Sequence, residues 1–258
     1  MLLSTFFWLV NVFDTPTIEK IIFSSAISIL YIICQFGQRY KKLRNHKGAF
    51  AEFLHITQRI TQKIKIMKSI KGTLTEQNLL KAFAGESQAR NRYSFFASKA
   101  KKEGYEQIAA IFLETAEQEK EHAKRFFKFM EGGMANIYEA TYPAGRIGTT
   151  SENLLAAAMG EKEEWDTLYP TFAQSAIDEG FFEIAAAFNN IASVEAEHER
   201  RYLKLLSRIS DGDYFHRDEE IWWQCRNCGY IIKASDVPQL CPTCLHPKAF
   251  FEPMRDNY

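Results

Sequence analysis

Two copies of one short pattern, Glu119-x-x-His122 and Glu195-x-x-His198, occur in the same chain. An isolated glutamate precedes each copy at nearly the same distance, Glu86 before the first and Glu161 before the second. Residues at i and i+3 project from one face of a helix, so each copy offers a carboxylate and an imidazole side by side. Two such pairs and two single carboxylates make a ligand set for two metal ions.

The elements that must position these ligands are helices. Apolar residues between Thr73 and about Asp211 recur with helical period, and glycines divide the stretch into four segments. Thr73-x-x-Glu76 has the form of a capping box, so the first helix is expected to begin there and to end near Gly104. The second is expected from about Tyr105 to Gly132.

Both motifs fall on inward-facing seams, with seam residues three or four positions apart. The seams are Ile108, Phe112, Thr115, Glu119, His122 and Phe126 in the second helix, and Ile184, Phe188, Ile191, Glu195, His198, Tyr202 and Leu205 in the fourth. Glu86 and Glu161 share the apolar rows of the first and third helices, so four carboxylates are expected to meet in one interior. Burying several ionised carboxylates costs several kcal/mol each unless cations compensate them. Two divalent ions would do so.

Glycines also predict how the helices connect. Gly104 and Gly180 mark short turns, so the helices pair as two hairpins, joined by a long connection over residues 132–150. This is the ferritin-like four-helix arrangement, in which carboxylates and Glu-x-x-His motifs hold two iron or manganese ions. Pro170 lies inside the third helix and predicts a kink about one turn beyond Glu164. From spacing alone, Glu164 is either a seventh ligand or a surface residue.

A second metal site is predicted near the C-terminus. The pairs Cys225-x-x-Cys228 and Cys241-x-x-Cys244 are spaced as two thiolate turns around one tetrahedral ion. Spacing does not separate structural zinc from redox-active iron, and both interpretations stay open. The aromatic residues expected to shield this site are Trp222, Trp223, Tyr230, Phe250 and Phe251.

Composition excludes one class of partner. The chain has 258 residues, with 32 Lys and Arg against 32 Asp and Glu, so no net charge draws it toward nucleic acid. Residues 1–66 differ from the rest because residues 21–36 are apolar and a basic run follows them. Two interpretations stay open for this extension: a membrane tether that keeps the body in the cytoplasm, or a functional chain that begins at Met67.

From Met67 to about Glu252 the chain resembles the rubrerythrin family. The features that carry the resemblance are the run from Ala84 to Tyr93, the two Glu-x-x-His motifs, Gly160-Glu161 with Glu164, Tyr169-Pro170, and the CxxCGY and CPxC pairs. The resemblance implies a mainly α chain with a ferritin-like bundle over residues 67–212 and a small rubredoxin-like metal domain over residues 220–258. It also implies two iron ions in the bundle and one iron in the four-cysteine site, for which zinc is the alternative.

Carried over residue by residue, the resemblance assigns metal ligands and neighbours. The implied di-iron ligands are Glu86, Glu119, His122, Glu161, Glu164, Glu195 and His198, and the implied ligands of the second site are Cys225, Cys228, Cys241 and Cys244. Glu119 and Glu195 would bridge the irons. Glu164 and His122 would exchange as ligands to one iron when the redox state changes. Tyr93 and Tyr169 would lie close to the centre as hydrogen-bonding partners.

The implied activity is an oxidoreductase, a peroxidase that reduces hydrogen peroxide to water in defence against oxidative stress. Electrons would pass through the four-cysteine iron and originate from NAD(P)H by way of a separate reductase or a rubredoxin, because the chain has no glycine-rich nucleotide motif. A homodimer is implied, in which the four-cysteine site serves the partner subunit. The rival hypotheses are a ferritin-like iron oxidation and storage protein with a zinc ribbon, and a non-catalytic electron-transfer or metal-binding protein with a membrane tail.

Overall fold

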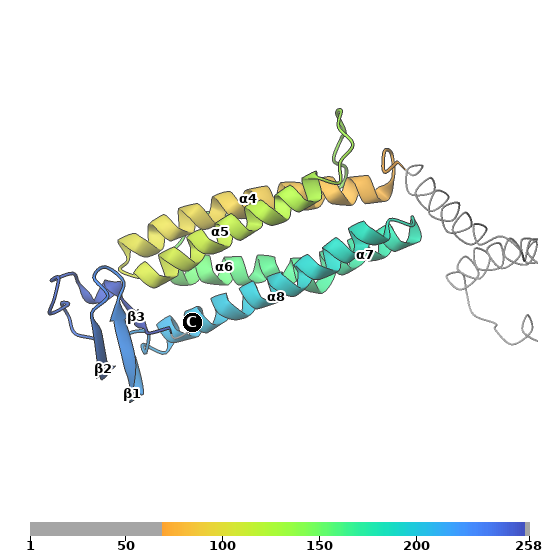
Figure 1. The fold of residues 1–258 in the computed structure, drawn as a ribbon. Coiled ribbons are helices and arrows are strands. Elements are labelled where there is room, and N and C mark those ends of the chain that lie inside the picture. The colour runs from red at the N-terminus through yellow and green to blue at the C-terminus, as the bar shows by residue number, and fades with distance from the viewer. Residues whose placement is uncertain (1–68, 256–258) are drawn as a thin grey trace, which may run out of the picture. The chain divides into compact units, whose positions relative to one another are not determined.

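The computed structural model describes residues 69–255 (Figure 1). The N-terminal extension and its apolar segment at residues 21–36 therefore lie outside the described residues. Between residues 69 and 255, no helix combines the length and the apolar character needed to cross a membrane.

Four helical arms form a bundle from two hairpins. In the first hairpin, α4 (Leu74–Lys102) packs along α5 (Glu106–Phe127). In the second, α6 (Thr150–Glu163), a π-helical turn (Glu164–Leu168) and α7 (Tyr169–Asp178) make up one arm, which packs along α8 (Phe182–Ser210). Residues 128–149 make the long connection, and Figure 1 shows the two hairpins lying side by side. The ferritin-like arrangement is confirmed.

The third arm shows how the expected kink is built. Proline has no N–H, so Pro170 cannot donate to a carbonyl one turn earlier, and an α-helix cannot continue unchanged through it. A π-helical turn just before Pro170 accommodates the proline, and in it the Tyr169 N–H donates to the carbonyl of Glu164. A π turn holds one extra residue and re-aims the side chains that follow it. The turn begins at Glu164, which the spacing had marked as a candidate ligand.

Each hairpin caps the first helix of the other. Glu179 accepts hydrogen bonds from the backbone N–H of Thr75 at 2.8 Å and from its hydroxyl at 2.6 Å. Glu103 does the same for Thr150, at 2.7 Å and 2.6 Å. Both threonines are fully buried, so each carboxylate satisfies a helix N-terminus that has no access to water. These reciprocal contacts fix the two hairpins relative to each other.

The seams of α5 and α8 face the core as expected. All their residues are buried except His122, which is partly buried. Two aromatic clusters lie at either end of the metal-ligand candidates: one contains Tyr93, Phe112 and Tyr202, and the other Phe126, Tyr169 and Phe188. Apolar packing thus encloses the polar centre at both ends along the bundle axis.

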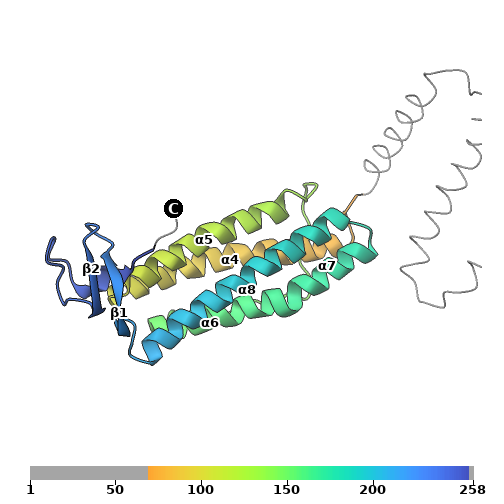
Figure 2. The same ribbon diagram turned by 60° about the horizontal axis from the view of Figure 1, so that its bottom comes forward.

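A small antiparallel sheet follows the bundle. It consists of β1 (His216–Cys225), β2 (Ile231–Asp236) and β3 (Phe251–Pro253) in the order β2-β1-β3, with a 3-10 turn at Lys248–Phe250, and Figure 2 shows it at one end of the bundle. Trp223 and Phe251 are fully buried in its core. The prediction that Trp222 shields the cysteines is wrong: its side chain is 54% exposed, because adjacent strand residues face opposite sides of a sheet.

Candidate metal centres

The structure brings four glutamates and two histidines together between the hairpins. They form two overlapping groups, in each of which one ligand atom per residue lies within 4.8 Å of the others. The groups are Glu86, Glu119, His122 and Glu195, and Glu119, Glu161, Glu195 and His198. Glu119 and Glu195 belong to both groups, so each can reach two ions.

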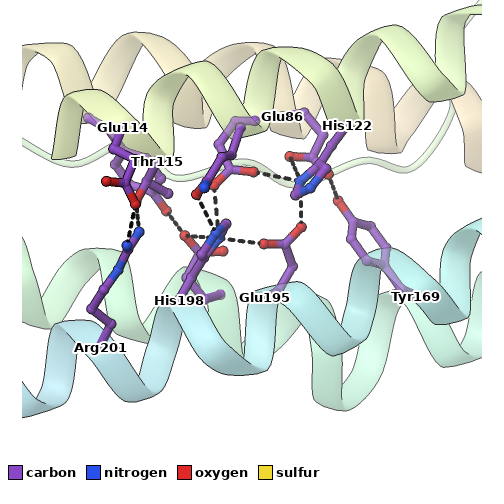
Figure 3. A network of polar contacts seen from close by, with 12 residues as sticks. Glu86, Glu114, Thr115, His122, Tyr169, Glu195, His198 and Arg201 are labelled. Carbon is purple, nitrogen blue, oxygen red and sulfur yellow. Dashed lines mark hydrogen bonds and ion pairs between the residues drawn. The ribbon is translucent and has the colours of Figure 1, made fainter. Parts of the chain in front are cut away.

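His122 projects from α5 across the interior toward α8. Its Nδ1 lies 2.8 Å from Glu195 Oε1 and 3.0 Å from Glu119 Oε2, and the more distant Glu86 Oε2 is at 3.8 Å (Figure 3). Three carboxylates from three helices therefore converge on one ring nitrogen.

His198 projects from α8 in the opposite direction. Its Nδ1 lies 2.7 Å from Glu195 Oε2 and 3.2 Å from Glu119 Oε1 (Figure 3). The other ring nitrogen, Nε2, lies 3.0 Å from the side-chain oxygen of Gln118. The Gln118 oxygen can only accept, so Nε2 carries the proton and Nδ1 faces the carboxylates.

These atoms fit metal ions rather than a hydrogen-bonded network. The buried polar atoms that have no hydrogen-bond partner in the described chain include Glu86 Oε2, Glu119 Oε1, Glu161 Oε2, both Glu195 oxygens and His198 Nδ1. An unpaired buried carboxylate oxygen is strongly unfavourable, and here five of them point into one small interior. Oxygen and imidazole donors at this density suit iron or manganese.

Two tyrosines connect the hairpins beside this centre. The Tyr93 hydroxyl donates to Glu161 Oε1. The Tyr169 hydroxyl donates to Glu86 Oε1 at 2.5 Å (Figure 3). Each tyrosine thus holds the single glutamate of the other hairpin. Both rings are fully buried, so the hydrogen bonds fix the direction in which the two carboxylates point.

Glu164 is placed differently from the other candidates. It belongs to neither group and is only partly buried. Its carboxylate lines a cavity of about 160 Å³ together with Gly85, Arg92, Tyr142 and Tyr169. A Cβ built on Gly85 would lie 3.6 Å from Glu164 Oε1, so the carboxylate rests against the backbone of α4 beside Glu86. Glu164 therefore stands next to the centre, at its border with a cavity.

The four cysteines form a second, separate site. Cys225 Sγ lies 3.8 Å from Cys244 Sγ, and Cys228 Sγ lies 3.6 Å from Cys241 Sγ. Sulfurs about 2.3 Å from a central ion in a tetrahedron are about 3.8 Å apart, so the geometry fits one tetrahedral ion. The backbone N–H of His246 points at Cys244 and lowers the pKa of its thiol to about 6, which favours the thiolate that a metal requires.

Comparisons with known proteins agree with both sites. The family model for rubrerythrin matches residues 77–206, and the model for the rubredoxin-like domain of rubrerythrin matches residues 223–252. Rubrerythrin from Porphyromonas gingivalis is 67% identical over 199 residues, which cover 77% of this chain and 99% of that protein. The chain belongs to the rubrerythrin family. Rubrerythrin-1 from Clostridium acetobutylicum is 57% identical over 196 residues, covering 74% of this chain and all of that protein.

A solved structure of nigerythrin in a partially reduced state is 33% identical, covers 72% of this chain and 89% of its own, and has a TM-score of 0.48. Rubrerythrins are oxidoreductases, and this member has the two metal sites that the family implies: a di-iron site with carboxylate and histidine ligands in the bundle, and a four-cysteine site in the rubredoxin-like domain.

Without iron, protons supply the positive charge that this rubrerythrin centre needs. Burial raises the pKa of Glu86 and Glu161 well above the usual range, and the Glu119 and Glu195 charges add to that effect. Burial lowers the pKa of His198, but the adjoining Glu119 and Glu195 carboxylates outweigh it and raise the pKa to about 9. Burial also disfavours the charged form of Glu119, but the two imidazoles lower its pKa to about 2. At neutral pH the metal-free centre is therefore partly protonated.

The affinity of metal-free protein for ferrous iron is expected to rise between pH 6 and pH 9. Groups whose pKa is raised hold protons that the incoming ion must displace, and each displaced proton makes binding more favourable as pH increases. Anaerobic titration with Fe(II) at several pH values measures this. Repeating the titration calorimetrically in buffers of different ionisation enthalpy counts the protons released, and an affinity independent of pH would contradict the protonated centre.

Sequence patterns alone missed several polar residues around the centre. Gln118 contacts His198. Arg201 donates to the Thr115 hydroxyl and to Glu114, each at 2.6 Å (Figure 3). Gln118 directly precedes Glu119 and carries no metal-ligand signature. A comparison of the two motif copies would have singled it out, because the residue before Glu195 is Val194.

Proposed function

We propose that the chain is a non-haem di-iron peroxidase that reduces hydrogen peroxide to water and so protects the cell against oxidative stress. The observation that carries the proposal is Glu164, a seventh candidate ligand placed between the two carboxylate–histidine groups and a cavity. A simple iron-oxidising centre needs no additional carboxylate that can enter and leave the ligand set.

The ligand assignment within this proposal follows the two groups. Glu86 and His122 would serve one iron, and Glu161 and His198 the other. Glu119 and Glu195 would bridge, because each is a member of both groups. Glu164 would exchange with His122 at the first iron when the oxidation state changes. Partial burial leaves both side chains more freedom than the fully buried glutamates have.

The reaction needs two electrons and two protons: H2O2 + 2 e− + 2 H+ gives 2 H2O. When bound, the diferrous pair supplies the electrons. Protons are held by the chain itself, because burial raises the pKa of Tyr93 and Tyr169 and keeps both hydroxyls protonated beside Glu161 and Glu86. The tyrosines therefore remain hydrogen-bond donors at neutral pH, and they keep the carboxylates aligned while ligands exchange.

The cavity beside Glu164 offers a route for peroxide. About 160 Å³ is ample for a molecule only slightly larger than water, and the connection between the hairpins covers it with residues 139–143. Arg92 lines the same cavity, and its positive charge acts against the burial that disfavours the Glu164 carboxylate. Arg92 would thus limit the rise in the pKa of Glu164 that burial causes.

The four-cysteine site, with iron bound, would resupply the electrons. It would do so within a homodimer. The 3-10 turn of the cysteine domain reaches the start of α5, where Ala249 lies 3.7 Å from the Cβ position of Gly104. Glu119 lies more than three turns beyond Glu106, at which α5 begins, or about 20 Å along the helix. Electron transfer slows steeply with distance, and the proposal therefore takes the di-iron centre of a partner subunit as the acceptor.

Transfer between subunits makes a specific prediction for mixed dimers. Chains with Glu195→Ala keep the cysteine site, and chains with Cys228→Ser keep the di-iron ligands, so either homodimer alone is expected to be inactive. Dimers that combine the two chains contain one intact pair of sites across the interface and are expected to regain up to about half of wild-type turnover. Peroxidase turnover of purified mixed dimers measures this, and mixed dimers that remain inactive would argue for transfer within one chain.

The electron donor in this proposal is a rubredoxin or an NAD(P)H-dependent reductase, a separate protein in either case. The proposed division of labour follows the predicted domains: residues 67–212 carry out peroxide reduction, and residues 220–258 pass electrons. Residues 1–66 have no role in the proposed chemistry.

Stopped-flow oxidation of the diferrous protein separates this function from iron storage. The proposal predicts that stoichiometric hydrogen peroxide oxidises the di-iron centre at least about tenfold faster than oxygen at equal concentration. An iron-storage protein would instead react readily with oxygen, take up many irons and form a large assembly with zinc in its cysteine site. Faster oxidation by oxygen would refute the proposed peroxidase.

A further inference from the structure

The aromatic clusters at the two ends of the metal-ligand candidates are copies of one another. Four rings of each cluster are equivalent, because they are separated by the same interval as the two Glu-x-x-His motifs. The equivalent pairs are Tyr93 and Tyr169, Phe96 and Phe172, Phe112 and Phe188, and Phe126 and Tyr202. The packing repeats as well. The ring centroids of Tyr93 and Tyr202 are 5.6 Å apart, and those of Tyr169 and Phe126 are also 5.6 Å apart.

One hydroxyl distinguishes the two sets of four rings. Tyr202 in the first cluster occupies the position that Phe126 occupies in the second. The Tyr202 side chain is fully buried, and its hydroxyl has no hydrogen-bond partner among the described residues. A buried hydroxyl without a partner is unfavourable, and the second cluster shows that a phenylalanine fills the same place. Packing therefore does not account for the hydroxyl, which points to a chemical role.

A second hydroxyl lies beside the first. Thr115 is fully buried on α5, and its equivalent in the repeat is Ile191. Burial and the charge of Glu161 raise the pKa of Tyr202, and the Thr115 hydroxyl acts against both, so the two hydroxyls are neighbours. One half of the bundle thus has two hydroxyls where the other half has two apolar side chains, Phe126 and Ile191.

Thr115 is connected to the protein surface through Arg201. The Arg201 guanidinium reaches from α8 to the Thr115 hydroxyl and to the Glu114 carboxylate, each at 2.6 Å (Figure 3). The side chains of Arg201 and Glu114 are 28% and 46% exposed, so this end of the line is in contact with water. The equivalent arginine, Arg125, instead forms its ion pair on the exposed surface. A line of polar groups thus leads from solvent to Tyr202 in this half of the bundle.

The inner end of the line reaches the metal centre. The Tyr202 ring packs edge-on against Tyr93, whose hydroxyl donates to Glu161. Glu161 and Glu119 both act on Tyr202 through their charges. The cavity described above is lined instead by Tyr169, the equivalent of Tyr93. The polar line and the cavity therefore approach the ligand set from different ends.

We propose that the hydroxyls of Thr115 and Tyr202 form a proton path from the surface at Glu114 to the di-iron centre. This inference rests on the proposed function, in which each hydrogen peroxide consumes two protons. For each proton that Tyr202 gives up on the inner side, its oxygen accepts one from Thr115, directly or through a bound water. Thr115 takes its replacement from solvent at the Glu114 end. Both hydroxyls are therefore unchanged after each transfer, and peroxide and protons reach the centre from different ends.

Two near-isosteric substitutions interrupt the path at different points. Tyr202→Phe reproduces the ring of the second cluster, and Thr115→Val retains the shape of threonine. Each is expected to keep the iron content and to slow peroxide oxidation of the diferrous protein by about 100-fold at neutral pH. The loss relative to wild type is expected to shrink as pH falls, because a higher proton concentration supports slower alternative routes.

Tyr214→Phe is the matched control and should change neither iron content nor oxidation rate. Tyr214 is a buried tyrosine of the same apolar cluster as Tyr202, but its hydroxyl donates to Gln107 at 3.2 Å. The control therefore removes a buried phenol hydroxyl that lies outside the proposed path.

Zinc provides a readout that needs no turnover. Zinc binding to the metal-free centre displaces protons from its glutamates and histidines. In protein with zinc already in the four-cysteine site, a zinc-indicator dye reports zinc uptake, and a pH-indicator dye reports proton release in parallel stopped-flow runs. The two signals are expected to coincide in wild type and Tyr214→Phe. In Tyr202→Phe and Thr115→Val, proton release is expected to lag behind zinc uptake by at least about tenfold.

The two readouts separate failure of this inference from failure of the proposed function. If wild-type diferrous protein prefers oxygen to peroxide, the peroxidase proposal fails, while zinc-coupled proton release still tests the path. Proton release that keeps pace with zinc uptake in both variants would overturn the path. A loss of peroxide rate that is the same at every pH would also overturn it, because such a loss indicates a purely structural role. If Tyr202→Phe does not fold, Thr115→Val alone decides the same two comparisons.

Discussion

Glu195→Ala is expected to lower the iron content from about three ions per chain to about one while leaving the visible colour of the four-cysteine iron intact. Glu195 belongs to both ligand groups, and its two oxygens have no hydrogen-bond partner among the described residues. Removing it takes one ligand from each ion. It also removes a charge that compensates both His122 and His198. Peroxide reduction is then expected to fall to the background rate.

The variant can be checked for folding and for specificity. The buried carboxylates repel one another in the metal-free protein, so loss of one is expected to leave the bundle folded, as measured by helical circular dichroism. Glu197→Ala is the matched control, because Glu197 lies two positions further along α8 with its side chain 65% exposed, and it pairs with Arg200 at the surface. A Glu195→Ala protein that retained about three irons would refute the bridging role.

Glu164→Ala is expected to separate iron binding from turnover. Glu164 lies outside both ligand groups, so the variant should keep about three irons per chain. Peroxide turnover is expected to fall by about 10- to 100-fold, because an iron that loses His122 as a ligand would gain no carboxylate in its place. The pH dependence gives a second readout: burial raises the pKa of Glu164 well above its usual range, so wild-type turnover should decline as pH falls and the carboxylate is protonated.

The control for this variant is Asp166→Ala, an exposed carboxylate in the same π-helical turn. It preserves the turn and changes the same net charge, so a general effect of charge or helix geometry would appear in both proteins. Equal turnover in Glu164→Ala and wild type would remove the main support for a peroxidase over an iron-storage protein.

Periodicity was sufficient to place the four residues of the two motifs. A Glu and a His three positions apart on an apolar seam must face the same interior, and Glu119, Glu195 and His198 are indeed buried there. The inward positions of Glu86 and Glu161 were predicted for the same reason, because each residue lies in the apolar row of its own helix. Helix bounds were less well predicted: α5 ends at Phe127 instead of Gly132, because an apolar pattern does not reveal where backbone hydrogen bonding stops.

Sequence patterns did not predict the contacts between the two hairpins. That Tyr93 binds Glu161 while Tyr169 binds Glu86 depends on how the hairpins pack, not on spacing within either. The placement of Glu164 could not be derived either, because Pro170 predicts a break in the helix but not a π turn that begins at Glu164. Trp222 was misplaced because the strand register decides which of two adjacent tryptophans is buried.

The most direct test of the account is to follow the visible spectrum of iron-loaded protein through one redox cycle, with iron and zinc content measured on the same sample. The account predicts ferric-thiolate colour that bleaches on reduction and returns rapidly with hydrogen peroxide, and only slowly if Glu195 is replaced by alanine. A colourless protein with zinc in the four-cysteine site, inert to peroxide after reduction, would contradict the peroxidase and favour iron storage or metal binding.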